Sequence, residues 1–311
     1  MKHVIVTQDL PADVLQATAA RFQVSQISLK ALGPEAFLKQ IGEPDALIVS
    51  PGDPVNAALI AELPESVRVI SSYSVGLDHV DLAAAEARGI TVTNTPDVLT
   101  DATADVALLL ILGALRGAAE AFRMISEDRW TGWQPAQVFG RDVTGKRLGI
   151  YGAGRIGLAT VKRAQAFGMP VHYWSGRSRS ADFDAIGAEP VSDMDAFLSR
   201  CDVLSLHCPS TPTTRGLVNA ALIEKLPPRA VLINTGRGDL VVDGDVIAAL
   251  KSCRLGAVGL DVFNGEPDID PRYRTLSNAF VLPHIGSATE ETRLAMGKVL
   301  LANLHDALSG T

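Results

Sequence analysis

Short apolar runs alternate with amphipathic stretches over the first hundred residues. Apolar runs of four or five residues bounded by turn residues are typical of buried strands, and apolar residues three or four positions apart are typical of helices. This alternation predicts a parallel sheet covered by helices. The predicted strands are His3–Thr7, Ala46–Ser50, Arg68–Ser72 and Ile90–Thr93, and the predicted helices are Ala12–Arg21, Pro34–Gln40 and Leu82–Arg88.

A nearly continuous apolar stretch follows, from Thr100 to about Arg129. Thr100 or Asp101 can cap a helix there, and the early acidic residues suit its N-terminal dipole. We therefore predict one long helix that is buried on several sides, as a helix between two domains or two subunits would be.

The alternation resumes at Lys146 and ends in a predicted terminal helix over Ala288–Leu308. Each strand of this half leads into a loop with polar residues or glycine. Because the carboxyl ends of parallel strands share one edge of a sheet, these loops form one group of candidate ligand-binding residues. The predicted strands are Arg147–Tyr151, Val171–Trp174, Val203–His207, Ala230–Asn234, Ala257–Leu260 and Phe280–Leu282.

Composition limits the kinds of partner. The 311 residues, 47% of them hydrophobic, are enough for about two domains. A net charge of −7 argues against a nucleic-acid partner. Three cysteines without metal-ligand spacing predict neither a disulfide framework nor a metal site. There is no signal-peptide pattern, and the longest apolar run, Val106 to Leu115, is too short to span a bilayer, so we expect a cytoplasmic protein without a membrane partner.

The most specific pattern is Gly152-Ala153-Gly154-Arg155-Ile156-Gly157, which follows the apolar run Leu148–Tyr151 and opens a helical pattern. The first glycine permits a tight turn, and the second lets a pyrophosphate approach the backbone. The third lets helix and strand pack closely, and the helix N-terminus offers N–H groups to the anion. We predict a bound dinucleotide; the alternative is an ordinary turn between strand and helix.

The strand after the glycines predicts which dinucleotide binds. An NAD-binding unit usually presents an acidic residue about 20 residues beyond the glycines, where it bonds the ribose hydroxyl. No acidic residue follows Trp174 directly. Arginines and serines there could instead receive a 2′-phosphate, which favours NADPH over NADH; the alternative is a solvated basic loop. The loop reads Ser175-Gly176-Arg177-Ser178-Arg179.

A carbonyl-reducing enzyme also needs a proton donor and a cation. His284 comes just after the last predicted strand, and Glu266 follows the strand before it. A carboxylate beside an imidazole holds one tautomer and favours the protonated form. Arg237, in a glycine-rich loop, could bind a carboxylate bidentately. Each of the three could instead be a structural ion-pair partner.

Together these motifs resemble the D-isomer-specific 2-hydroxyacid dehydrogenases, and most closely the glyoxylate/hydroxypyruvate reductase branch. The resemblance covers nearly the whole chain. Five motifs in order are far more specific than one. They are Gly152–Gly157, Leu206-His207-Cys208-Pro209, Ile233-Asn234-Thr235-Gly236-Arg237-Gly238, Gly259-Leu260-Asp261-Val262-Phe263 with Glu266-Pro267, and Pro283-His284-Ile285-Gly286.

The resemblance implies roles for individual residues. Arg237 would bind the 2-oxo acid, His284 would be the acid/base, and Glu266 would pair with it. The backbone of Val75 and Gly76, after Ser74, would hold the substrate carboxylate. Asp261 would contact the nicotinamide carboxamide, and Trp133 would reach the partner's active site or only pack in the core or an interface. The remaining expected cofactor residues are Gly152, Ala153, Gly154, Arg155, Ile156, Cys208, Pro209, Thr214, Thr235, Gly236, Gly286 and Thr103.

The resemblance also implies an architecture and a reaction. It predicts an α/β protein with two Rossmann-like or flavodoxin-like domains, each with a parallel sheet, an active site in the cleft between them, and a homodimer. Residues 1–98 with 286–311 would form the substrate domain, and 99–285 the dinucleotide domain. The expected reaction is NADPH-dependent reduction of glyoxylate or hydroxypyruvate. A 2-keto-gluconate-type reductase or another 2-hydroxyacid dehydrogenase is the alternative, and a dinucleotide-sensing binding protein or corepressor is a more remote one.

Overall fold

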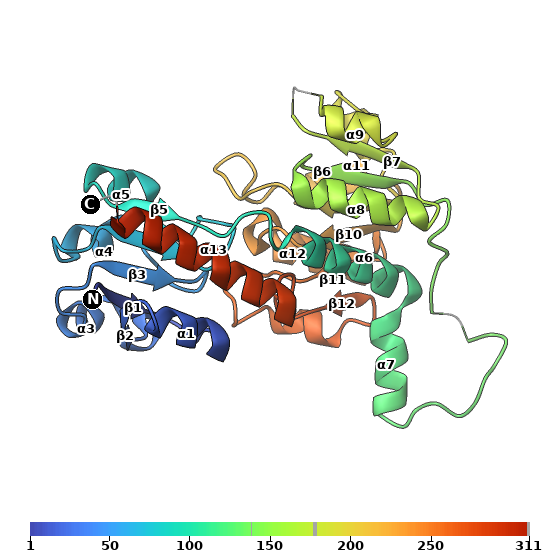
Figure 1. Ribbon diagram of the computed structural model, residues 1–311. Coiled ribbons are helices and arrows are strands. Elements are labelled where there is room, and N and C mark those ends of the chain that lie inside the picture. The colour runs from blue at the N-terminus through green and yellow to red at the C-terminus, as the bar shows by residue number, and fades with distance from the viewer. Residues whose placement is uncertain (138, 177–178, 310–311) are drawn as a thin grey trace. The chain divides into compact units, whose positions relative to one another are not determined.

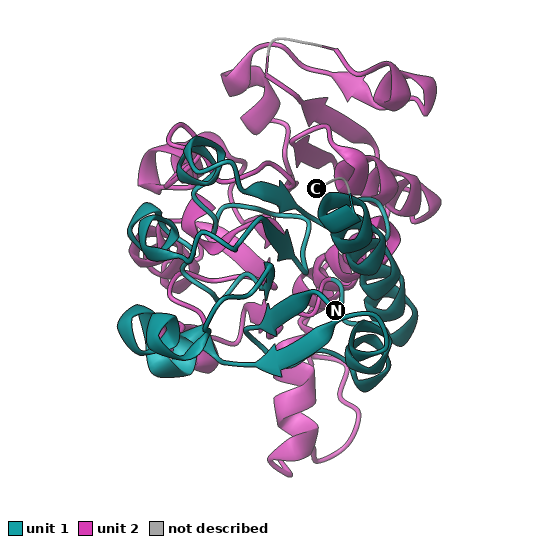
Figure 2. Ribbon diagram, turned by 60° about the vertical axis from the view of Figure 1, so that its left-hand side comes forward, with its two compact units in different colours: residues 1–99, 287–311 teal, residues 100–286 magenta. Residues whose placement is uncertain are grey.

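The computed structural model describes residues 1–137, 139–176 and 179–309. The chain forms two compact units, which Figure 2 shows in different colours: unit 1 comprises Met1–Leu99 and Ser287–Thr311, and unit 2 comprises Thr100–Gly286. Each unit is built around its own sheet, and all strand pairs in both sheets are parallel. The prediction of two α/β domains with parallel sheets is therefore confirmed.

The sheet of unit 1 has the order β2-β1-β3-β4-β5. Its strands β1, β3, β4 and β5 were predicted from their apolar residues. The edge strand β2 was not, because Gln23, Ser25 and Gln26 interrupt any apolar run and the strand is only partly covered. The strands are β1 His3–Val6, β2 Gln23–Gln26, β3 Ala46–Val49, β4 Val69–Ser72 and β5 Thr91–Thr93.

Helices cover both faces of this sheet. Alternate strand residues such as Ile5, Leu47 and Ile70 pack with Phe37 in one core beneath α2–α5. On the other face, α13 packs against α1, and a Cβ atom on Gly297 would lie 2.5 Å from Val14. The helices are α1 Ala12–Ala19, α2 Leu29–Leu32, α3 Pro34–Gln40, α4 Ala57–Glu62, α5 Leu82–Ala87 and α13 Glu290–Ser309 (Figure 1).

The sheet of unit 2 has the order β12-β11-β10-β9-β6-β7-β8. Its order reverses at β6, because β7 and β8 lie on one side of β6 while β9 to β12 lie on the other. Loops at such a reversal diverge and leave a crevice, which is where open α/β sheets bind nucleotides. The strands are β6 Leu148–Tyr151, β7 Val171–Trp174, β8 Glu189–Pro190, β9 Val203–Leu206, β10 Ala230–Asn234, β11 Leu255–Leu260 and β12 Ala279–Val281.

Two cores hold the helices of unit 2 on this sheet. Ile111, Ile150 and Val161 belong to the core under α6, α8 and α9. Phe197 and Val246 belong to the core under α10, α11 and α12. The helices are α6 Thr100–Arg116, α8 Arg155–Ala166, α9 Ala181–Ala185, α10 Met194–Leu198, α11 Ala220–Lys225 and α12 Asp243–Lys251, with short 3₁₀ turns at Gly238–Leu240 and Pro271–Thr275.

The prediction of one long helix from Thr100 to about Arg129 is wrong. Gly117 adopts a left-handed conformation (φ 65°) that ends α6, and α7 (Ala118–Ser126) starts after it at a bend of 73°. The apolar pattern alone could not show this break, because apolar residues continue on both sides of the glycine. Figure 1 shows α7 projecting from unit 2.

No single helix in the described part of the chain is long and apolar enough to cross a membrane, although the bent pair α6 and α7 passes that test together.

Candidate active site

The glycine turn after β6 lies against the end of β9. Gly152 has φ 108°, and a Cβ atom there would lie 2.7 Å from the Cys208 nitrogen. A Cβ atom on Gly157 would lie 2.7 Å from the Gly152 oxygen. By contrast, no other described part of the chain lies within 4 Å of the position that a Cβ atom on Gly154 would take. The first and third glycines therefore allow close packing, and the second faces open space.

These features fit a dinucleotide. Helix α8 begins directly after Gly154, which has no side-chain cap, so its first turn offers N–H groups and a positive dipole end through Arg155 and Ile156. Nearby, the Thr235 hydroxyl is buried and has no hydrogen-bond partner among the described residues. A pyrophosphate could approach the open glycine, and a cofactor polar group could satisfy this hydroxyl.

The loop after β7 has fewer unpaired groups for binding a 2′-phosphate than the sequence suggests. The Arg179 guanidinium lies 3.0 Å from the Asp184 carboxylate, which also accepts the Tyr173 hydroxyl at 2.8 Å. One of the two arginines expected to receive a 2′-phosphate is therefore already paired. Ser175 and Gly176 follow β7 as expected, whereas Arg177 and Ser178 lie outside the described residues.

The loops after β9 and β10 touch each other. A Cβ atom on Gly236 would lie 3.2 Å from the Cys208 oxygen. Burial raises the pKa of the Cys208 thiol to about 11, so it stays protonated near neutral pH. The Thr214 hydroxyl donates to the Pro209 oxygen at 2.7 Å, so this hydroxyl shapes its own loop.

A fully buried amide holds the Arg237 loop. The Asn234 side chain donates to the Arg237 oxygen at 2.7 Å and accepts from the Gly236 nitrogen at 2.9 Å. A Cβ atom on Gly238 would overlap the backbone of Phe263 and Asn264. The Arg237 loop therefore rests directly on the segment that leads to Glu266. Asn234 and Gly238 were not among the predicted site residues; for Asn234, a polar residue at the end of a buried strand was the available signal.

The Glu266–His284 pair is formed. The His284 Nδ1 lies 2.7 Å from one Glu266 oxygen, and the Phe263 nitrogen donates to the other at 2.7 Å. Partial burial pushes the pKa of Glu266 upward, but its hydrogen bond to His284, together with the charges of His284 and Arg237, leaves that pKa below its ordinary value. Glu266 is therefore a carboxylate near neutral pH, and Arg237 is close enough to influence it.

Asp261 anchors the loop that carries His284. Its side chain is 1% exposed, and its two oxygens accept from the Ile285 and Gly286 nitrogens at 2.8 Å each. Burial raises the pKa of Asp261 despite these bonds. A Cβ atom on Gly286 would lie 3.4 Å from Thr103, so Thr103 packs against the same loop. His284 itself has φ 55°, a left-handed conformation that is rare outside glycine and often marks functional sites.

Ser74, Val75 and Gly76 lie in unit 1, in the loop after β4. Among the described residues, the Val75 and Gly76 nitrogens donate to no protein acceptor. The Ser74 hydroxyl donates to the Gly76 oxygen at 2.7 Å. Two adjacent N–H groups without an internal acceptor are suited to an anion.

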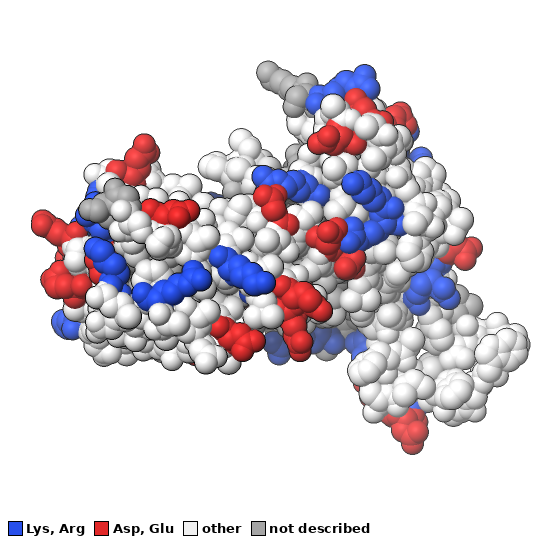
Figure 3. Space-filling model, in the orientation of Figure 1, with Lys and Arg blue, Asp and Glu red and all other residues white. Residues whose placement is uncertain are grey.

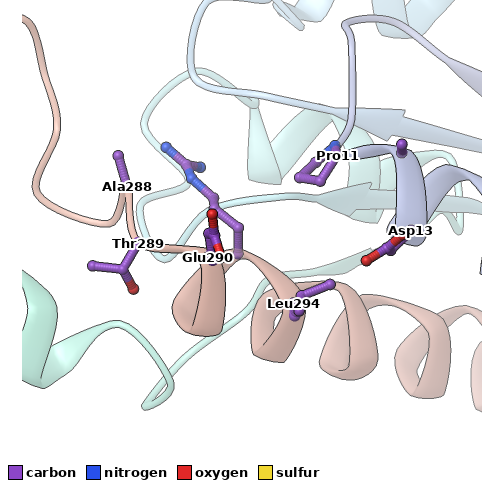
Figure 4. Close-up of a pocket in the computed structure, with 8 residues that line it drawn as sticks. Pro11, Asp13, Ala288, Thr289, Glu290 and Leu294 are labelled. Atoms are coloured by element: carbon purple, nitrogen blue, oxygen red, sulfur yellow. The ribbon is translucent and has the colours of Figure 1, made fainter.

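Two further features are an exposed tryptophan in unit 2 and a cavity in unit 1. Trp133 is 80% exposed, in the segment after α7. A cavity of about 410 Å³ lies at the start of α1 and α13 in unit 1, lined by residues that include Pro11, Asp13, Thr289 and Glu290 (Figure 4). None of the predicted site residues that the structure describes lines this cavity.

The fold and the site together indicate a class of enzyme. A nucleotide-binding strand order, an open glycine turn and a carboxylate–imidazole pair at the loop ends of one sheet are typical of nicotinamide-dependent dehydrogenases.

Comparison with known proteins gives the family. Residues 108–286 match the model of the D-isomer specific 2-hydroxyacid dehydrogenase, NAD binding domain. A glycerate dehydrogenase of Hyphomicrobium methylovorum is 44% identical over 86% of this chain and 83% of its own. A glyoxylate reductase of Thermococcus litoralis is 37% identical over 97% and 92%.

A solved structure agrees over almost the whole chain. It is the NADPH-dependent glyoxylate/hydroxypyruvate reductase of Sinorhizobium meliloti in complex with NADP and malonate. This structure has a TM-score of 0.88 and 31% identity, and the match covers 99% of this chain and 94% of that one. The chain therefore belongs to the D-isomer-specific 2-hydroxyacid dehydrogenase family. It is an oxidoreductase with a nicotinamide cofactor that interconverts 2-oxo and 2-hydroxy acids, as the five motifs predicted.

The contact at Gly238 predicts a sharp effect of one methyl group. In Gly238→Ala, the added Cβ must push the Arg237 loop away from the segment before Glu266. We expect kcat for 2-oxo acid reduction to fall about a hundredfold, because small misplacements of catalytic groups are costly. Gly244→Ala is the matched control, since no described atom lies within 4 Å of its Cβ position. Wild-type kcat in Gly238→Ala would contradict this account of the site.

Proposed function

We propose that this protein reduces a short 2-oxo acid, glyoxylate or hydroxypyruvate, to the D-2-hydroxy acid with NADPH. The hydrogen bond of 2.7 Å between Glu266 and His284 carries the proposal, because it orients a proton donor at the loop edge of the dinucleotide-binding sheet. The names of the glycerate dehydrogenase and glyoxylate reductase relatives support the substrate class. Larger acids such as 2-keto-gluconate are the alternative substrates.

The residues of this chain supply binding and proton transfer, while a bound nicotinamide supplies the hydride. The Glu266 carboxylate accepts a hydrogen bond from the Nδ1–H of His284, which leaves the Nε2–H of His284 free to face the carbonyl oxygen of the substrate. The Nε2 atom then gives its proton to that oxygen. His284 ends the step neutral, with Nδ1–H still held. The Arg237 guanidinium binds the oxo acid and polarises its carbonyl group.

The N–H groups of Val75 and Gly76 hold the substrate carboxylate, which assigns unit 1 to the substrate and unit 2 to the dinucleotide. Asp261 and Thr103 border the nicotinamide. Because both Asp261 oxygens already accept backbone N–H groups, an Asp261 contact to the carboxamide would use their remaining lone pairs. The match of residues 108–286 to an NAD-binding domain supports the assignment of unit 2.

NADPH is proposed over NADH because no acidic residue directly follows Trp174, the last residue of β7. The NADP complex of the Sinorhizobium meliloti relative supports this choice. Since Arg179 is paired with Asp184, Arg177 becomes the main candidate for the 2′-phosphate.

We also propose that the active form is a homodimer. None of the residues Ala118–Ser126, all of them described, is buried, and Phe122 and Ile125 are exposed. Arg123, in the same helix, donates to the Leu276 oxygen at 2.9 Å and fixes α7 to its own unit. Figure 3 shows a mostly uncharged surface over α7 and the segment after it, where Trp130 and Trp133 are also exposed. Such an apolar patch fits a second copy.

Replacing His284 tests the reaction. In His284→Asn, we expect kcat for glyoxylate and hydroxypyruvate to fall by at least a hundredfold, because the proton donor is lost. NADPH binding, measured by nicotinamide fluorescence, should stay unchanged. Unchanged turnover in the variant would refute the assignment. A wild-type protein that binds NADPH but reduces none of a panel of 2-oxo acids would instead favour the dinucleotide-sensing alternative.

The cofactor proposal predicts a difference between two arginines. Arg177→Ala should raise KM for NADPH about tenfold or more and leave KM for NADH unchanged, since a charge-assisted hydrogen bond to the 2′-phosphate is lost. Arg179→Ala is the control and should change KM for NADPH much less, because Asp184 holds its guanidinium. Steady-state kinetics in which wild-type enzyme prefers NADH would refute the proposal.

The dimer proposal predicts a change of mass. Wild-type protein should elute as a dimer in size-exclusion chromatography with light scattering, and the double variant Phe122→Glu with Ile125→Glu should elute as a monomer. Phe167→Glu, at another exposed phenylalanine of unit 2, is the control and should stay dimeric. A monomeric wild type, or a dimeric double variant, would show that α7 is not the interface.

A further inference from the structure

The two N–H groups proposed to bind the carboxylate belong to peptide units whose carbonyl groups are held by the protein. The Val75 nitrogen shares a peptide with the Ser74 carbonyl, which accepts from the Thr95 nitrogen at 2.9 Å. The Gly76 nitrogen shares a peptide with the Val75 carbonyl, which accepts from the Asn94 side chain at 2.8 Å.

Holding the carbonyl group of a peptide also directs its N–H group. The peptide unit is planar and trans, so its N–H and C=O bonds point in opposite directions. A hydrogen bond that fixes the C=O direction therefore fixes the N–H direction. Accepting a hydrogen bond at the oxygen also polarises the peptide and strengthens its N–H as a donor.

The two groups that donate to the Ser74 and Val75 carbonyl oxygens come from one short segment directly after β5. Asn94 and Thr95 are adjacent, and each holds one of the two peptides. Asn94 is itself held from the far end of the chain, because the Asn303 side chain in α13 donates to the Asn94 oxygen at 2.8 Å. The Tyr73 hydroxyl, one residue before Ser74, bonds the Arg293 oxygen at 2.5 Å in the same helix. All of these residues belong to unit 1.

We propose that Asn94 is a positioning residue for the substrate carboxylate, and that Asn303 in turn positions Asn94. Asn94 keeps the Val75–Gly76 peptide in the orientation that directs the Gly76 N–H outward to the anion. The inference rests on the proposed function, in which Val75 and Gly76 bind the carboxylate. Asn94 does not touch the substrate, so its loss weakens binding of the carboxylate without removing a reacting group.

A KM-against-kcat comparison distinguishes positioning from general stability. In Asn94→Ala, KM for glyoxylate should rise about fivefold to tenfold, the effect of one lost hydrogen bond. The kcat and the KM for NADPH should stay within about twofold of the wild-type values. Asn303→Ala should raise KM for glyoxylate about twofold to threefold, because Asn94 keeps its own bond to Val75 but loses its support.

Asn56→Ala is the matched control. Asn56 also lies in unit 1, and its side chain accepts from the Leu59 nitrogen at 3.0 Å at the start of α4. Its loss lowers the melting temperature through a lost helix cap but should leave KM for glyoxylate unchanged. An equal rise of KM in Asn56→Ala, or unchanged KM in Asn94→Ala, would overturn the inference.

Binding of malonate tests the inference separately from the reaction. Malonate should raise the melting temperature of wild-type protein, and this rise should be reduced in Asn94→Ala and kept in Asn56→Ala. If wild-type protein reduces no 2-oxo acid, the proposed function fails, while this measurement still decides whether Asn94 prepares an anion site. An equal malonate effect in all three proteins overturns the inference. If Asn94→Ala does not fold, Asn303→Ala supplies the same comparisons.

Discussion

The active loops of unit 2 depend on close approach between backbones, which only residues without a Cβ atom allow. Gly152 lets the turn after β6 touch the end of β9, and Gly157 lets α8 start against that turn. Gly238 lets the Arg237 loop rest on the segment before Glu266. Because these contacts are between backbones, they leave little freedom to adjust. The positions of Arg237 and Glu266 are therefore linked before any ligand binds.

Buried polar side chains then hold each loop in a defined conformation. Asn234 ends β10 and holds the Arg237 loop, and Asp261 follows β11 and holds the backbone after His284. In unit 1, Asn94 follows β5 and holds the peptide before Gly76. In each case a side chain next to a strand end bonds the backbone of a functional loop. The rigid sheet thereby fixes the backbone conformation of loops that have no regular secondary structure.

The sequence predicted most of the strands because their residues are apolar on both sides, as buried parallel strands require. It missed β2 and β8, which are edge strands with polar residues and little cover. It also extended one helix through Gly117. Hydrophobic periodicity continued there, whereas the left-handed turn depends on local backbone conformation and on Phe139, whose oxygen would clash with a Cβ atom on this glycine.

The sequence by itself determined the features that depend on neighbouring residues: the strands, the glycine turn with its helix, and the kinds of reactive side chain present. Its motifs also named Glu266 and His284 as partners, through resemblance to a family. Only the tertiary structure decided which groups bond. It paired Arg179 with Asp184, directed both Asp261 oxygens to the His284 loop, and brought Asn303 to Asn94 across 209 positions of the chain. The physical reason is that hydrogen bonds act over about 3 Å, and only the folded arrangement of strands, loops and helices brings particular groups within that range.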